Sequence, residues 1–160
     1  MANPILVRQA IRKFKSDSIT ENDINELIRA FNASPCGLSQ KVMSLTVIKS
    51  KEYLDMVEDK VGDAVYHAPL IFLISSQKDN QFGPLDSAAA AENVMVEAAR
   101  LGLGSVYSMS GGMALNEYRD ILQKLGVDDN YDAQVAVCIG KPEQELKELN
   151  RDGRYKVVMR

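Results

Sequence analysis

Hydrophobic residues recur along the chain with two different periods. Between residues 20 and 31 the apolar side chains stand three or four residues apart, as on one face of a helix, and Thr20 precedes them as a candidate N-cap. The segments 70–75 (LIFLIS) and 133–140 (AQVAVCIG) are instead apolar almost throughout. Runs of this length are typical of strands that are buried on both faces of a sheet. The pattern therefore predicts a domain with both helices and strands.

The remaining periodic segments complete the predicted order of elements. We expect further helices over residues 3–11, 50–61, 87–101 (capped by Asp86) and 115–126, and further strands over 43–48, 104–109 and 155–159. No repeat or linker divides the chain, so the sequence predicts a single α+β domain over residues 1–160, with a mixed β-sheet flanked by helices. About fifteen polar residues precede the last strand, which makes it a candidate for exchange between subunits.

Composition narrows the class of protein. With 46% hydrophobic and 26% charged residues, the 160-residue chain resembles one globular domain, and its net charge of −3 argues against a general nucleic-acid binder. Cys36 and Cys138 form no CxxC motif, and with His67 as the single histidine, which we interpret as structural, there is no zinc-ligand set. No apolar run is long enough to span a bilayer, and no leader pattern opens the sequence. We expect a cytoplasmic protein with reduced thiols and without a metal, membrane or nucleic-acid partner.

Motifs that carry chemistry are scarce. The sequence has no GxSxG, P-loop or HExxH motif, and no GxGxxG opens a helix after a strand, so any chemistry is expected to belong to a bound cofactor. Core packing does not account for segments 8–15 (RQAIRKFK), 34–40 (SPCGLSQ) and 102–112 (GLGSVYSMSGG). Their ordinary interpretations are a solvated basic face, a turn, and a helix C-cap followed by a turn. Alternatively, Arg8 and Arg12 share a face of the predicted N-terminal helix and together contact a phosphate.

The order of these segments resembles the FMN-dependent nitroreductase family. RQAIRKF (8–14) is similar to the family pattern RRSxRxF, and ASPCGLSQKVM (33–43) to APSxxNxQPW. LDSAAAAENVMVEAARLGLGS (85–105) is similar to the small-residue helix of the type D-x-x-x-A-x-E/Q-N that leads into GLGS, and VCIGKP (137–142) to the strand that ends in I-G-x-P. The resemblance covers nearly the whole chain, and the last two blocks are its most specific parts.

The resemblance implies a homodimer, because members of this family enclose FMN at the interface of two subunits. The residues that it places at the cofactor are Arg8, Gln9, Ala10 and Arg12 at the phosphate and ribityl region, Pro35, Cys36, Gly37 and Ser39 on the wall from the partner subunit, Tyr107, Ser108, Met109 and Ser110 along the flavin ring, and Arg154 at the phosphate. A backbone N–H of the 108–110 segment would point at flavin N5, and Lys60 is a candidate at the pyrimidine end.

The implied function is an NAD(P)H-dependent FMN oxidoreductase that passes hydride via FMN N5 to a small acceptor such as a nitroaromatic or quinone. No side chain of the protein would act as a catalytic residue, which agrees with the absence of catalytic motifs. Departures from the family pattern favour an alternative, a flavin-binding or regulatory module with little turnover: Ala10 replaces serine, Ser39 replaces asparagine, and Val42 and Met43 replace the Pro-Trp pair. A specialised reaction, such as dehalogenation or flavin destruction, would need lid residues that the short segment 76–85 leaves little room for.

Overall fold

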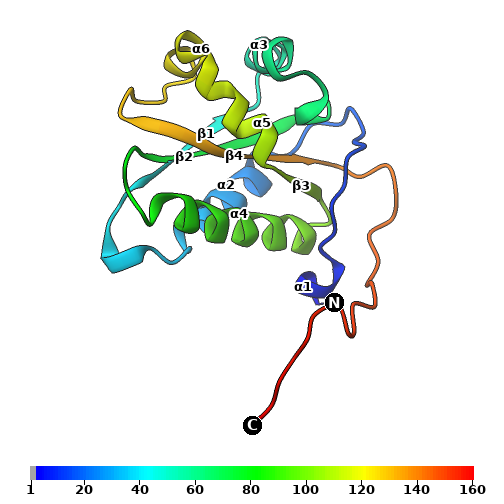
Figure 1. Ribbon diagram of the computed structural model, residues 1–160. Helices are drawn as coiled ribbons and strands as arrows, with labels where there is room; N and C mark the ends of the chain where they lie inside the picture. Colours follow the sequence, from blue (N-terminus) through cyan, green and yellow to red (C-terminus); the bar gives the residue numbers. More distant parts are fainter. Residues whose placement is uncertain (1–2) are drawn as a thin grey trace.

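A four-stranded sheet covered by helices on both faces makes up the body of the molecule, of which the computed structural model describes residues 3–160 (Figure 1). The elements are α1 (Pro4–Val7), α2 (Glu21–Asn32), η1 (Gly37–Ser39), β1 (Met43–Ile48), α3 (Lys51–Val61), η2 (Gly62–Val65), β2 (Leu70–Gln77), α4 (Gly83–Arg100), β3 (Gly104–Ser108), α5 (Met109–Ala114), η3 (Leu115–Glu117), α6 (Arg119–Lys124) and β4 (Tyr131–Gly140). None of the helices found in residues 3–160 combines the length and apolarity needed to cross a membrane.

The strands follow the order β1-β2-β4-β3, and each neighbouring pair is antiparallel. Within the described residues, parallel pairing is limited to a single bridge between Ala10 and Ser105, at the outer edge of β3. The α+β class is confirmed, and the mixed character of the predicted sheet is confined to that bridge. The N-terminal segment therefore runs beside β3 and covers an edge that would otherwise be exposed.

β2 lies inside the sheet and is buried on both faces, as its continuous apolar sequence predicts. Leu70, Phe72 and Ile74 belong to the core beneath α2 and α4, whereas Ile71 and Leu73 belong to the core beneath α3 and α6. Figure 1 shows these two helical layers on opposite sides of the sheet. Alternate side chains of one strand thus anchor both layers, as the period of two in a strand requires.

α4 is the long central helix, and its small side chains allow close packing on the sheet. Ala90, Ala91 and Ala98 are all 0% exposed. The helix begins at Gly83, so the predicted cap at Asp86 is wrong: Asp86 lies inside the first turns and is itself buried. Gly102 follows the helix with φ of +75°, as the predicted C-terminal glycine should.

Two predicted helices differ from the structure. The N-terminal helix ends at Val7 instead of reaching residue 11, because the Ile11 N–H donates to the Ser105 carbonyl at 2.9 Å and draws residues 8–15 into an extended path. Arg8 and Arg12 therefore do not share a helix face. The predicted helix 115–126 is divided, since α6 covers only Arg119–Lys124, and the strand predicted to reach 109 ends at Ser108.

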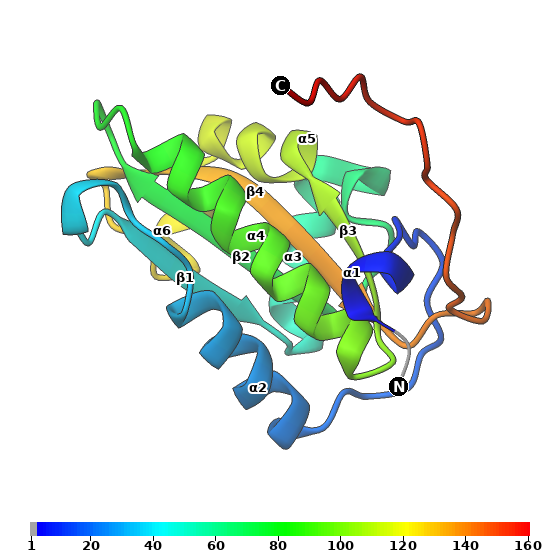
Figure 2. The ribbon, with the colours of Figure 1, turned by 90° about the horizontal axis from the view of Figure 1, so that it is seen from below.

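The C-terminal segment, residues 141–160, contains no helix or strand. It first runs beside the N-terminal segment, and its last residues extend away from the body (Figures 1 and 2). The strand predicted over 155–159 is therefore not formed within this chain. Its apolar side chains stay in solvent, with Val157 80% and Met159 93% exposed. Exchange of this segment with a second subunit stays a prediction.

Candidate functional site

The N-terminal segment and β3 bring the first group of predicted site residues together. Ala10 bridges to Ser105, two residues before Tyr107, so the extended segment that carries Arg8 and Arg12 runs along the edge of β3. The Gln9 side chain donates to the carbonyl of Lys147, in the C-terminal segment, at 3.3 Å. The basic segment is thus fixed against the strand that leads into α5.

Arg8 is held by a carboxylate of α4. Its Nε lies 3.1 Å from Oε1 of Glu92, and the two side chains are 23% and 50% exposed. Among residues 3–160 no hydrogen bond uses the two terminal nitrogens of this guanidinium, which are left for another acceptor. Arg12 is exposed and lies over the Tyr66 ring at 5.8 Å from its centroid. The two cations therefore flank the Ala10–Ser105 bridge, with Arg8 held at α4 and Arg12 at Tyr66. A guanidinium at either place is suited to contact a phosphate.

The start of α5 gives residues 107–110 a different conformation from the one predicted. Ser108 ends β3 and caps α5: its Oγ accepts the N–H of Gly111 at 3.1 Å and donates to the Ala64 carbonyl at 2.5 Å. Met109 and Ser110 form the exposed first turn of α5, where backbone N–H groups have no partner within the helix. Partial burial raises the pKa of the Tyr107 hydroxyl above its ordinary value.

The second group of predicted residues lies elsewhere on the chain, in the loop between α2 and β1. Pro35, Cys36 and Ser39 are exposed, and the loop borders a hollow of about 370 Å³. Figure 2 shows this loop near one end of α4 and α1 near the other. No hydrogen bond or ion pair in residues 3–160 joins the loop to the basic segment, so one chain does not bring the two groups together.

The remaining predicted residues lie outside both groups. Arg154 is exposed in the C-terminal segment, with its guanidinium 5.2 Å from the Tyr155 ring centroid. Its neighbour Arg151 instead ties this segment to the N-terminus, donating to the carbonyls of Leu6 at 2.8 Å and Arg8 at 2.6 Å. Lys60 lies 5.7 Å from the centroid of the Tyr118 ring.

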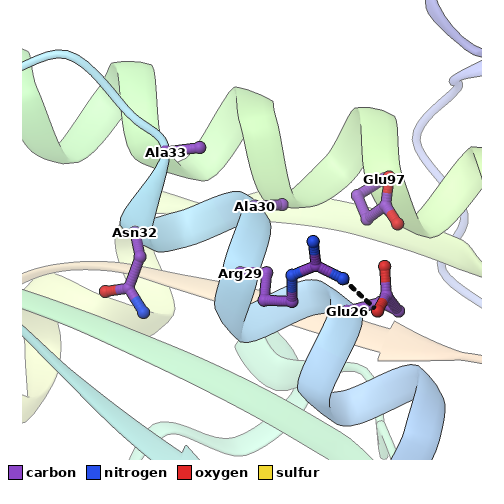
Figure 3. A pocket seen from close by; sticks show the side chains of 6 residues that line it. All are labelled: Glu26, Arg29, Ala30, Asn32, Ala33 and Glu97. Carbon is purple, nitrogen blue, oxygen red and sulfur yellow. Dashed lines mark hydrogen bonds and ion pairs between the residues drawn. The ribbon is translucent and has the colours of Figure 1, made fainter.

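A separate hollow of about 520 Å³ lies between α2 and α4 (Figure 3). It is lined by Glu26, Arg29, Ala30, Asn32, Ala33 and Glu97. Its charges already have partners, since Arg29 binds Glu26 at 2.8 Å and Glu97 binds Arg100. None of the predicted site residues lines it, and its internally paired charges leave little to hold an anionic ligand.

Thiol labelling of the folded protein is expected to show different reactivities for the two cysteines. Cys36 is exposed, whereas Cys138 is 0% exposed in β4, where burial raises the pKa of its thiol to about 12. Because the thiolate is the reactive form, Ellman's reagent at pH 8 should titrate one thiol in the native chain and two in denaturant. A Cys36→Ser control should leave no thiol that reacts before unfolding, and rapid native labelling of that variant would contradict the burial of Cys138.

Known proteins supply an independent comparison for this arrangement. The sequence profile of the nitroreductase family matches residues 57–141, more than half of the chain. The chain belongs to the nitroreductase family. It is 26% identical over 158 residues to the NADPH-flavin oxidoreductase of Vibrio harveyi, covering 88% of this chain and 65% of that relative. This nitroreductase-family chain thus spans slightly less than two thirds of that relative's length.

Solved structures of nitroreductases share its fold. A nitroreductase with bound FMN from Bacteroides fragilis superposes with a TM-score of 0.87 at 22% identity, covering 98% of this chain and 97% of the other. An FMN-dependent nitroreductase from Clostridium difficile gives 0.83 at 24% identity, with coverages of 99% and 98%. The predicted nitroreductase-like fold is confirmed by these likenesses.

Two partners of the candidate site residues were not predicted from the sequence. Glu92 pairs with Arg8, and Asp86 accepts the N–H of Gly37 at 3.0 Å. Both lie in the α4 segment that carries the family resemblance, but their partners are far away in the chain. Helix periodicity shows which face of α4 a residue occupies, and it carries no signal for such distant pairings.

Proposed function

We propose that this chain is a homodimeric, FMN-dependent NAD(P)H oxidoreductase of the nitroreductase family that reduces a small acceptor such as a nitroaromatic or quinone. The observation that carries the proposal is that Arg8, which is paired with Glu92, and Arg12 both lie on a segment fixed against the strand that leads into α5. The family membership and the FMN bound in the Bacteroides fragilis relative support this assignment.

The donor set on this chain fits the chemistry of FMN. Arg8 retains two terminal nitrogens for the phosphate, and Arg12 adds a second exposed cation. The exposed first turn of α5 offers backbone N–H donors at Met109 and Ser110, with no large side chain from the neighbouring Gly111 or Gly112. When bound, FMN supplies the hydride-transfer chemistry for which this chain has no side-chain motif.

In this proposal the residues of the chain bind and orient the cofactor. The Glu92 carboxylate keeps the Arg8 guanidinium in one orientation, so that less conformational freedom is lost when an anion binds. A backbone N–H of the 108–110 segment would stabilise charge on the ring edge that it faces. Arg154, on the exposed C-terminal segment, would add a cation to the phosphate.

A homodimer is proposed because the two groups of site residues lie apart on one chain. A second copy would bring its Pro35–Ser39 loop to the basic segment of the first. Exposed apolar side chains at both places support such an interface: Leu38 is 78% and Leu85 69% exposed near the loop, and Met109 is 57% exposed on α5. Burial of the apolar 155–159 segment would add to it.

The decisive experiment is a titration of the purified protein with FMN, followed by anaerobic addition of NADH or NADPH. We expect stoichiometric binding, bleaching of the visible absorbance by the nicotinamide, and steady oxidation once a quinone or nitroaromatic is added. Failure to bind FMN would defeat the proposal. Tight binding without bleaching or turnover would favour the flavin-binding module, and a monomer that holds FMN tightly in sedimentation would refute the shared site.

A further inference from the structure

The loop between α2 and β1 is held in place by the short segment that opens α4. Both oxygens of Asp86 face the backbone N–H of Gly37, at 3.1 Å and 3.0 Å. Asp86 is only 8% exposed, and within residues 3–160 its carboxylate accepts hydrogen bonds from no group other than the Gly37 N–H. A buried carboxylate is costly unless it is hydrogen-bonded, so this contact ties the loop firmly to α4.

Two further contacts come from the same segment. The Phe82 ring lies so close to Gly37 that a β-carbon there would stand 2.5 Å from the ring. The Asn80 side chain donates to Oε1 of Gln40 at 3.0 Å, while its own Oδ1 accepts the N–H of Phe82 at 2.9 Å. Residues 80–86 therefore contact the loop at both ends of η1, at Gly37 and at Gln40.

The conformation of the loop requires this support. Leu38 and Ser39 have φ of 51° and 58°, a left-handed conformation that residues with a β-carbon adopt at a cost. The turn closes on itself through one hydrogen bond, from the Gln40 N–H to the Gly37 carbonyl at 3.0 Å. Such a conformation persists only where its surroundings determine it, and here the surroundings are Asp86 and Phe82.

We infer that Asp86 is a positioning residue of the cofactor site: through the Gly37 N–H it holds the Cys36–Ser39 loop in the left-handed form that faces the FMN bound by the partner subunit. This inference rests on the proposed function. It gives a reason for a buried carboxylate on α4 that, among residues 3–160, forms no ion pair and is not the N-cap of the helix. Without Asp86 the loop would sample other conformations, and part of the binding free energy would be spent on ordering it.

The test compares Asp86→Ala with Asp86→Asn, and with Ser87→Ala as a matched control. Asparagine keeps one oxygen that can accept from Gly37. Ser87 is the next residue of α4, is also buried (0% exposed against 8% for Asp86), and its hydroxyl has no hydrogen-bond partner in residues 3–160. The dissociation constant for FMN is expected to rise about tenfold in Asp86→Ala and to stay within about threefold of wild type in Asp86→Asn and Ser87→Ala.

Two readouts separate positioning from a general loss of stability. In the apoprotein, amide exchange at Gly37 should accelerate at least about tenfold in Asp86→Ala, while core amides of β2 and β4 keep their protection. The visible circular dichroism of bound FMN should also change. If Asp86→Ala fails to fold, Asp86→Glu replaces it: the charge is kept, the carboxylate moves by one methylene, and about a fivefold weaker affinity is expected.

Each outcome bears on one claim. If wild type does not bind FMN, the proposed function fails. If wild type binds FMN, and the folded Asp86 variant keeps wild-type affinity, dichroism and Gly37 exchange, Asp86 has no positioning role and the proposed function stands. Equal loss of affinity in Ser87→Ala would likewise overturn the inference, because it would trace the effect to packing of α4.

Discussion

Replacing Arg8 with methionine is expected to weaken FMN binding about 100-fold, which corresponds to about 2.7 kcal/mol. Methionine keeps an unbranched apolar stem of similar reach, so the change removes mainly the guanidinium. Arg8 is 23% exposed and is held by Glu92 through Nε, which leaves its terminal nitrogens for two parallel hydrogen bonds to a phosphate. Removal would also leave the Glu92 carboxylate beside the phosphate, where the two negative charges repel each other.

The affinity is best measured by quenching of FMN fluorescence on titration with apoprotein, repeated at several salt concentrations. Arg100→Met is a matched control, because Arg100 also pairs with a glutamate of α4, Glu97, but on the side of the helix that faces α2. Its FMN affinity should stay within about twofold of wild type, since pairs of this exposed kind contribute little. An Arg8→Met protein with wild-type affinity would remove Arg8 from the phosphate site.

Replacing Gly112 with alanine is expected to destabilise the protein by about 3 kcal/mol. In an exposed helix this change would stabilise by roughly 1 kcal/mol, because alanine is the better helix former. At Gly112 a β-carbon would lie 2.6 Å from the Cα of Val135, so α5 would have to move away from β4. The obstacle is backbone in a buried strand, which cannot give way as a side-chain end can.

Thermal unfolding of the apoprotein checks the sign of this effect, with an expected drop in Tm of roughly 6–12 °C for a chain of this size. Met113→Ala is the control, since Met113 follows Gly112 in α5 and is 50% exposed. Its free energy of unfolding should change by less than about 0.5 kcal/mol. A Gly112→Ala protein that is more stable than wild type would show that α5 does not pack against β4 as closely as the structure has it.

Gly112 also changes the interpretation of the segment GLGSVYSMSGG. From the sequence it was interpreted as a helix C-cap followed by a turn, and the family resemblance placed residues 107–110 along a flavin. In the structure the segment has several separate roles: Gly102 ends α4, Ser108 caps α5, and Gly112 lets α5 approach β4. Tyr107 and the first turn at Met109 and Ser110 are exposed and remain available to the proposed cofactor.

Local patterns were sufficient to predict much of the fold. The helix at 20–31, the strands of 70–75 and 133–140, and the glycine after α4 were all recognised, because burial on one or both faces repeats at fixed intervals along the chain. The order of motifs was likewise sufficient to indicate the nitroreductase family. The periodic features depend on neighbouring residues and the motif order on the chain alone, so the sequence by itself determined both.

Contacts between distant segments decided the rest. The bridge from Ala10 to Ser105 overrides the local helical pattern of 8–11, because pairing with an exposed strand edge satisfies backbone groups that a short surface helix would leave to water. The partners of Arg8 and Gly37 on α4 follow in the same way from how α4 lies across the sheet. Periodicity indicates which face of a helix or strand is buried. Which residue from another segment contacts that face is decided only when the chain folds.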